Sequence, residues 1–215
     1  NDAPALKIAD IGVVVGTASD VAKETADLIL LDNNFGTIVS AIEEGRVIFD
    51  NIRKVVAYVL SDSFAEVITI FIAMLLGWPA PLLVAQILWI HLICDGPEDI
   101  VLGFEPKEDG IMDQPPRAVG APILDSLGAS LIAMISGLSA VFGLSVFGYY
   151  HLVLDDAVRG RSIVFASFAI SSVIYILAYR SLRTPIWRTR SIMTNKPLLY
   201  AIAFGLLLAV LPFVF

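Results

Sequence analysis

Cysteine and charged residues are both scarce in this sequence. Its 215 residues include one cysteine, Cys94, so an internal disulfide bond is excluded. Only 16% of the residues are charged, whereas 57% are apolar, and the mean hydropathy is +0.81. An ordinary soluble domain has about 25% charged residues, so this composition indicates that most of the chain lies in lipid. The net charge of −7 gives no support for a nucleic-acid partner.

Proline is absent between Pro4 and Pro79, which leaves a long interval without a helix breaker. From Thr37 onward, apolar residues recur with helical spacing and charged residues occupy the other faces. The pattern predicts one helix from Thr37 to about Leu76, about 60 Å long at 1.5 Å per residue. We expect this helix to begin in a soluble domain, to end across the membrane and to connect the two mechanically.

The residues before this helix have the pattern of a small α/β segment. Short apolar runs at Ile11–Val15 and Leu28–Leu31 flank a predicted helix at Ser19–Ala26. Buried strands of a parallel sheet, separated by one helix, have this pattern. The segment is too short to form such a domain by itself, so we expect it to be the tail of one.

Long apolar windows predict five membrane spans, each of about the 20 residues that a bilayer core requires. They lie at about 55–76, 82–104, 123–150, 162–182 and 198–215. This topology places 12 of the 14 lysines and arginines on one side, which the positive-inside rule identifies as cytoplasmic. We therefore expect a multi-pass protein with a cytoplasmic N-terminal segment, most simply in the plasma (cell) membrane. No signal peptide is recognisable, and the start at Asn1 suggests a C-terminal piece of a longer protein.

Two carboxylates, Glu66 and Asp95, occur in the middle of predicted spans. A charged side chain at the bilayer centre costs about 2.5–3.5 kcal/mol on insertion scales, so it persists where it faces protein, water or a cation. Gly96 and Pro97 directly follow Asp95, and proline removes a backbone donor, so we expect the second span to unwind or kink there. Unwound carbonyl groups at membrane depth are suitable cation ligands. These features predict an intramembrane cation site.

Further oxygen, nitrogen and sulfur donors share the helical faces of these two carboxylates. The first span adds Asp62 and Ser63, and the second adds His91, Cys94 and Glu98. Carboxylate, hydroxyl and carbonyl oxygens suit hard cations such as Ca²⁺ or Na⁺, whereas imidazole and thiol suit a transition metal. Simpler interpretations remain open. Asp62 is expected at the interface in contact with water, and Cys94 is expected to be a packing residue. His91 fits a core hydrogen bond, a proton acceptor or a ligand, and Glu98 and Asp99 fit residues that emerge into water.

Taken together, these pieces resemble the P-type cation-transporting ATPases of the calcium-pump-like branch. The resemblance is carried by NDAPALKIADIGVVVG, by TASDVAKETADLILLDNNFGTIVSAIEEGRVIFDNIRKVVAYVLSDSFAEV, and by ILWIHLICDGPEDIVLGFEP with IMDQPPR, and it covers residues 1–117. It implies a mainly α membrane protein with five transmembrane helices. Residues 1–36 would form the end of a HAD-like phosphorylation domain, residues 37–54 a cytoplasmic stalk helix, and residues 55–215 the cation-transport domain.

The resemblance also implies roles for individual residues. Asn1 would help to hold the transferred phosphoryl group and Asp2 would support the adjacent Mg²⁺ site, as catalytic residues. Glu66 and Asp95 match acidic metal ligands of the family. Three further ligand positions carry other residue types than usual, namely Ser63, His91 and Cys94. Ser172 stands where relatives have Glu or Gln, so the identity of the ion does not carry over with the fold.

The leading hypothesis is the ion-binding membrane portion of an ATP-driven cation pump, with Ca²⁺ or another small hard cation as cargo. The resemblance implies ATP and Mg²⁺ as cofactors, bound mostly outside this fragment, so the fragment alone would not hydrolyse ATP. The expected partners are membrane lipid, the transported cation and the preceding cytoplasmic and membrane parts of the same protein. Two alternatives stay open: a proton pump of the same family, in which His91 relays protons, and a truncated, non-catalytic ion-binding membrane subunit.

Overall fold

A computed structural model describes residues 3–118, 120–185, 188 and 191–214. The chain divides into two compact units. The first contains Asn1–Val47 and Gly110–Pro115, and the second contains Ile48–Asp109 and Pro116–Phe215.

The first unit contains the predicted strand–helix–strand segment. Strands β1 (Val13–Val15) and β2 (Leu28–Leu30) pair in parallel, with helix α2 (Asp20–Thr25) between them in the chain. The Ser19 hydroxyl caps α2 by accepting a hydrogen bond from the Ala22 amide. The predicted parallel pair is therefore confirmed. A short helix α1 (Ala3–Ile8) precedes it and was not predicted.

Helix α3 runs without interruption from Gly36 to Leu75, as the proline-free sequence predicted. Its 40 residues begin in the first unit and continue into the second. Gly45 does not interrupt the helix, and a Cβ atom at this position would have no neighbour within 4 Å.

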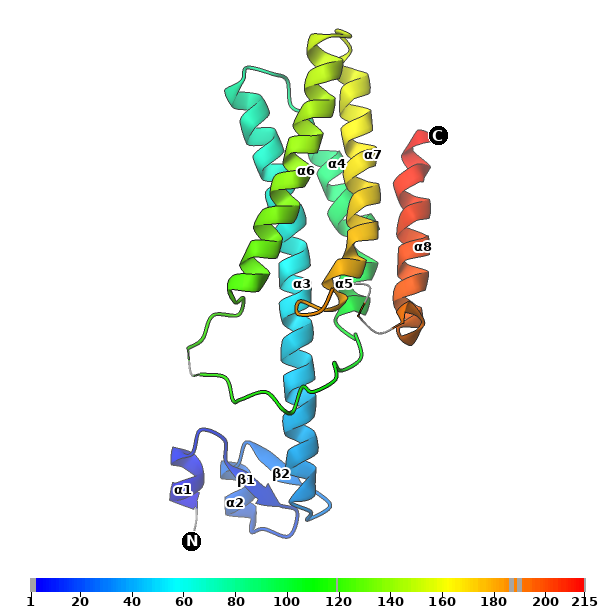
Figure 1. Cartoon of the computed structure of the whole chain (residues 1–215). Coiled ribbons are helices and arrows are strands. Elements are labelled where there is room, and N and C mark those ends of the chain that lie inside the picture. Colours follow the sequence, from blue (N-terminus) through cyan, green and yellow to red (C-terminus); the bar gives the residue numbers. More distant parts are fainter. Residues whose placement is uncertain (1–2, 119, 186–187, 189–190, 215) are drawn as a thin grey trace. The chain divides into compact units, whose positions relative to one another are not determined.

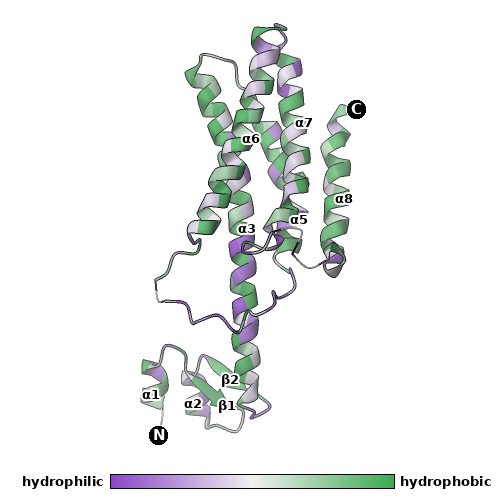
Figure 2. Ribbon diagram, in the orientation of Figure 1, coloured by the Kyte–Doolittle hydropathy of each residue, from purple (hydrophilic) through white to green (hydrophobic). Residues whose placement is uncertain are grey.

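The second unit is a helical bundle. Its other long helices are α6 (Ser126–Leu152), α7 (Ala157–Tyr175) and α8 (Lys196–Val210), and Figure 1 shows α6 and α7 side by side. The 3₁₀ turns η2 (Ile176–Arg180) and η4 (Leu211–Phe213) extend α7 and α8. Within the described residues, four helices are long and apolar enough to cross a membrane: α3, α6, α7 with η2, and α8 with η4. Figure 2 colours the ribbon by residue hydropathy and shows hydrophobic residues along most of α6, α7 and α8 and along the upper part of α3.

The predicted second span consists of three short helical pieces: α4 (Val84–Leu88), the π-helical turn η1 (Trp89–Cys94) and α5 (Gly96–Leu102). In η1 the Asp95 amide donates to the Ile90 carbonyl over 2.9 Å, five residues back. The expected break beside Asp95 is thus present, as a π turn rather than an unwound stretch. Continuous helices account for four of the five predicted spans. The remaining one, the second span at about 82–104, stays a prediction.

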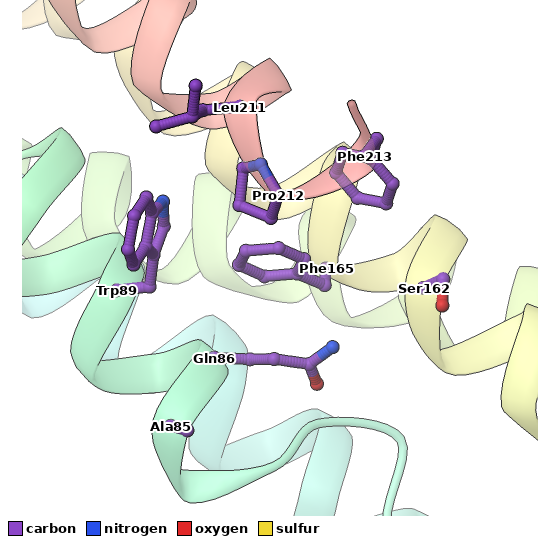
Figure 3. Close-up of a pocket in the computed structure, with 8 residues that line it drawn as sticks. All are labelled: Ala85, Gln86, Trp89, Ser162, Phe165, Leu211, Pro212 and Phe213. Carbon is purple, nitrogen blue, oxygen red and sulfur yellow. The ribbon is translucent and has the colours of Figure 1, made fainter. Parts of the chain in front are cut away.

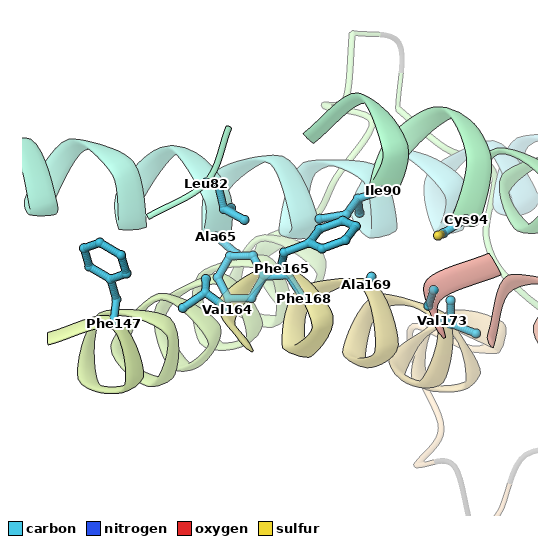
Figure 4. Close-up of a cluster of buried hydrophobic side chains, with 11 residues drawn as sticks. Ala65, Leu82, Ile90, Cys94, Phe147, Val164, Phe165, Phe168, Ala169 and Val173 are labelled. Carbon is cyan, nitrogen blue, oxygen red and sulfur yellow. The ribbon is translucent and has the colours of Figure 1, made fainter. Parts of the chain in front are cut away.

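Small residues allow the helices to approach closely. A Cβ atom on Gly143 of α6 would lie 2.9 Å from the Phe168 ring, and one on Gly148 would lie 2.6 Å from Trp78. Figure 4 shows part of the resulting core, in which Phe165 and Phe168 of α7 pack near Ala65 of α3 and Ile90 of η1. This packing brings α3, η1 and α7 together, and the candidate site lies on these three elements.

Candidate cation site

Helix α3 supplies two buried carboxylates one turn apart. The side chains of Asp62 and Glu66 are separated by four residues, so they lie on the same helical face, and each residue is 3% exposed. The expectation that Asp62 contacts water at the interface is wrong. The α3 face that carries Asp62 packs against α7 and η1, so the carboxyl group is enclosed by protein.

His91 of η1 bridges these two carboxylates. Its Nε2 atom lies 2.9 Å from Glu66 Oε2, and its Nδ1 atom lies 3.6 Å from Asp62 Oδ2. One ligand atom from each of the three residues lies within 4.8 Å of the other two, which is close enough for a shared metal ion. We refer to Asp62, Glu66 and His91 as the α3–η1 cluster.

Asp95 adjoins this cluster at the break between η1 and α5. It is 2% exposed, and its Oδ1 atom accepts a hydrogen bond of 2.7 Å from the Ser172 hydroxyl of α7. Asp95 also interacts with the neighbouring Asp62 carboxyl group. Tyr175, one turn further along α7, donates to Asp62 Oδ1 over 3.1 Å. Two hydroxyl groups of α7 therefore orient two carboxylates that come from different elements.

Each of the three carboxylates keeps one buried oxygen without a hydrogen-bond partner among the described residues. These atoms are Asp62 Oδ2, Glu66 Oε1 and Asp95 Oδ2. Asp62 Oδ2 has His91 Nδ1 as a polar neighbour at 3.6 Å, which is beyond hydrogen-bond distance. Buried polar atoms in native proteins are nearly always satisfied, so this group of oxygens requires an explanation. Several carboxylate oxygens and one imidazole nitrogen form a donor set that fits a small divalent cation.

Two of the five predicted metal ligands lie outside the arrangement just described. Ser63 is half-buried, and no hydrogen bond connects its described side chain to the cluster. The Cys94 side chain is fully buried in the apolar core, and Figure 4 shows it near Ala169 and Val173. Cys94 thus packs as the simpler interpretation expected. Asn1 and Asp2, the predicted catalytic residues, lie outside the described residues.

The sequence interpretation missed two contributors, Asp62 as a buried group and Tyr175 as its donor. The signal for Asp62 was its four-residue spacing from Glu66. The signal for Tyr175 was its three-residue spacing from Ser172, which places both hydroxyl groups on one face of α7. Neither spacing shows that these faces of α3 and α7 contact each other.

A separate apolar pocket of about 450 Å³ lies between α4, α7 and η4. Figure 3 shows Trp89, Phe165 and Phe213 around it, with Gln86 and Ser162 as polar neighbours. It contains no carboxylate, so its lining does not suit a cation.

Comparison with known proteins agrees with this geometry. The family described as "Cation transporting ATPase, C-terminus" matches residues 79–215. A calcium-transporting ATPase 1 from Bacillus cereus is 37% identical over 98% of this chain, which corresponds to 25% of that protein's length. An endoplasmic-reticulum-type calcium-transporting ATPase 2 from Arabidopsis thaliana is 47% identical over 70% of the chain, or 14% of its own length.

A third relative, a cation-transporting ATPase from Synechocystis, is 36% identical over 85% of the chain and 20% of its own length. The chain therefore spans a quarter or less of the length of these relatives. The matches include the broken helix with His91 and Asp95, and the B. cereus match covers nearly all of the chain. The chain is thus an integral membrane protein that belongs to the P-type cation-transporting ATPase family, as part of its C-terminal membrane region.

Proposed function

We propose that this chain is the ion-binding membrane portion of an ATP-driven cation pump, with Ca²⁺ as the favoured cargo. One observation carries the proposal: three buried carboxylates with unsatisfied oxygens meet at a broken helix. In membrane transporters, broken helices and intramembrane carboxylates mark ion pathways. The names of the relatives, which are calcium- or cation-transporting ATPases, support the same cargo.

In this proposal Asp62, Glu66 and Asp95 bind the cation directly. Ser172 and Tyr175 act through them, because their hydroxyl groups fix the carboxylate orientations. His91 contributes a nitrogen ligand or occupies the space between Glu66 and Asp62 when the cation is absent. Ser63 remains a candidate ligand, since it is half-buried on α3 and lies three residues before Glu66.

The remaining parts of the proposal concern the whole pump. The first unit would be the end of a HAD-like phosphorylation domain in the cytoplasm, and the α3 residues before the membrane would form a stalk helix. Asn1 and Asp2 would serve the aspartyl-phosphate and Mg²⁺ site, with ATP bound elsewhere in the protein. The plasma membrane is the proposed location.

The test uses the full-length protein and separates ion binding from phosphoryl chemistry. Glu66→Gln and Asp95→Asn should each abolish cation-stimulated ATPase activity, because each removes a negative charge from the site. Phosphorylation by inorganic phosphate should remain measurable, because that reaction does not use the intramembrane residues. Glu44→Gln, the same chemical change at an exposed position of α3, is the matched control. Unchanged cation dependence in both site variants would contradict the proposal.

A proton pump is the second candidate, and the position of His91 between two carboxyl groups favours it. Protons can pass along such a chain of carboxyl and imidazole groups. ATP-driven acidification of vesicles in the absence of any divalent or alkali cargo, lost in His91→Asn, would support this candidate over Ca²⁺ transport. Ca²⁺ uptake that persists at constant pH in His91→Asn would exclude it.

A further inference from the structure

Arg161, in the second turn of α7, is a positive charge without an acidic partner among the described residues. Its Nε atom donates a hydrogen bond of 3.0 Å to the Ala80 carbonyl, in the segment between α3 and α4. Arg159 differs, because it is exposed and pairs with Asp156 at 3.5 Å. In the proposed topology both arginines lie on the extracytoplasmic side, where basic residues are disfavoured. The position of Arg161 therefore indicates an anionic ligand.

The apolar pocket between α4, α7 and η4 adjoins this arginine. Arg161 precedes Ser162 by one residue and Phe165 by four, and both of these residues line the pocket. The Ala80 carbonyl that holds Arg161 lies shortly before α4, whose Gln86 also lines the pocket. The positive charge and the pocket thus belong to the same contact between α4 and α7.

The lining of this pocket suits a hydrocarbon chain. Its volume of about 450 Å³ is within the range of roughly 300–1,000 Å³ that is usual for ligand pockets. Trp89, Phe165 and Phe213 surround it with aromatic rings, and no lining residue is charged (Figure 3). Ala85 and Phe213 are exposed, so the pocket is open at the surface of the second unit. In a membrane, lipid chains surround such a surface.

Gln86 supplies a polar group to the pocket. Its Oε1 atom accepts a hydrogen bond of 2.9 Å from the Leu83 amide, and its Nε2 atom has no partner among the described residues. Figure 3 shows this side chain extending from α4 toward α7. An amide N–H group donates well to a neutral carbonyl oxygen, such as that of a lipid ester.

We propose that this position binds one phospholipid of the extracytoplasmic leaflet, with its phosphate on Arg161 and one acyl chain in the pocket. The Nε atom of Arg161 is bonded to Ala80, so the phosphate would accept hydrogen bonds from the two Nη atoms. An arginine near the end of a membrane helix reaches the headgroup level. The Gln86 amide would donate to the ester carbonyl between phosphate and chain. A free phosphate ion would leave the pocket empty, whereas an uncharged amphiphile would leave Arg161 without an anion.

The bound chain would contact the elements that carry the candidate cation site. Trp89 is the first residue of η1 and lies two residues before His91. Its Nε1 atom donates to the Leu208 carbonyl of α8 over 3.1 Å. A lipid chain beside Trp89 would therefore stabilise the contact between η1 and α8. This lipid site does not depend on the proposed pump function.

The first experiment maps lipid contacts on the solubilised full-length protein. The probe is a phospholipid with a photoreactive diazirine in its acyl chain, and mass spectrometry identifies the labelled residues after irradiation. Label should appear on the pocket residues of α4, η1 and α7, and an excess of unlabelled phospholipid should suppress it. The proposal fails if these residues carry no label above background, as when another part of the full-length protein fills the pocket.

Arg161→Gln tests the phosphate contact and should reduce this label severalfold. Arg159→Gln is the matched control, because Arg159 is exposed and pairs with Asp156. Unlabelled diacylglycerol has the same chains without the phosphate, so it should compete severalfold more weakly than the phospholipid. Inorganic phosphate should not compete. Equal label in Arg161→Gln and wild type, equal competition by diacylglycerol, or competition by inorganic phosphate would overturn the assignment of Arg161.

Ala85→Phe tests the chain position without removing a charge. Ala85 is exposed where it lines the pocket, so the added ring can enter the pocket and should reduce the label on Phe165 severalfold. Ala133→Phe is the matched control, since Ala133 is an exposed residue of α6 outside the pocket. Equal labelling of these two variants would contradict a chain in the pocket. The readout does not require ATPase activity, so its failure is distinct from a failure of the proposed function.

Discussion

His91 distinguishes this cation site from one made of oxygen ligands alone. Its imidazole lies within contact of two carboxylates, and one of its ring nitrogens is 2.9 Å from Glu66. Imidazole nitrogen suits Zn²⁺ and similar ions better than Ca²⁺, whereas an amide oxygen suits Ca²⁺. In the proposed site, His91 would therefore affect which divalent cation the carboxylates select.

Replacement of His91 by asparagine tests this selectivity. In His91→Asn a nitrogen ligand becomes an oxygen ligand. We therefore expect the Ca²⁺ concentration for half-maximal ATPase activity to fall relative to the Mn²⁺ or Zn²⁺ concentration for half-maximal activity. The measurement is ATPase activity of the full-length protein against the concentration of each ion. His151→Asn is the control, since His151 of α6 packs against Trp78 and Phe147 and away from the cluster. An unchanged ratio of the two affinities would contradict a ligand role for His91.

At the scale of single elements, α6 has two distinct faces that both contain glycine. Gly143 faces the bundle, where a Cβ atom would lie 2.9 Å from Phe168, whereas Gly137 has no neighbour within 4 Å. Gly143→Leu should destabilise the protein by about 1–3 kcal/mol through overpacking. Gly137→Leu should have little effect. Thermal unfolding in detergent measures both variants, and equal midpoints would show that α6 does not pack on α7 through Gly143.

The start of α6 depends on one ionised side chain. Asp125 caps the helix by accepting a hydrogen bond from the Gly128 amide over 2.9 Å, and it pairs with Arg53 of α3 at 2.7 Å. The Gly128 hydrogen bond, and after it Arg53, lowers the pKa of Asp125 below its ordinary value. Its contribution to stability is therefore fully present above the unfolded pKa of about 3.9 and is lost as the pH falls through the folded pKa.

Asp125→Ala should cost about 1 kcal/mol at neutral pH, the usual cost of losing an N-cap. Asp125→Asn keeps a capping oxygen but not the charge, so it should cost less and should remove the acid sensitivity of this helix end. Hydrogen exchange of the first turn of α6 as a function of pH measures both effects. Equal protection in wild type and Asp125→Ala at neutral pH would contradict the assignment.

At the scale of the whole molecule, the sequence predicted the elements better than their contacts. The helical periodicity from Thr37 and the absence of proline before Pro79 together defined α3 to within one residue at each end, and Gly96-Pro97 located the break beside Asp95. Contacts between helices depend on side-chain packing that no local pattern encodes. For this reason Asp62 was assigned to water, although α7 encloses it through Tyr175.

The π turn was not predictable for a related reason. Proline at position 97 removes one backbone donor, which predicts a break but not its form. The form observed places His91 between Asp62 and Glu66, a contact that depends on the packing of η1 against α3. The periodicity of a sequence shows which residues share one face of a helix. Tertiary packing determines which neighbouring helix that face contacts.

Glu105 connects three chain segments of the second unit. It follows α5, pairs with Arg180 at the end of η2 at 2.6 Å, and accepts a hydrogen bond of 2.7 Å from the Asn195 side chain. Asn195 also caps α8 through the Leu198 amide. Both members of the ion pair are about 5% exposed or less. A buried pair of this kind is not always a net source of stability, but breaking it leaves an uncompensated charge.

A double-mutant cycle measures the coupling between these two residues. Glu105→Gln and Arg180→Met should each destabilise the protein by about 3–5 kcal/mol, because each removes one member of a buried ion pair. The double variant should be much more stable than the sum of the single effects predicts, since both charges are gone. The exposed pair Arg159–Asp156 is the control, and its loss should cost at most about 1 kcal/mol. Additive losses in thermal unfolding would show that Glu105 and Arg180 stabilise the bundle independently.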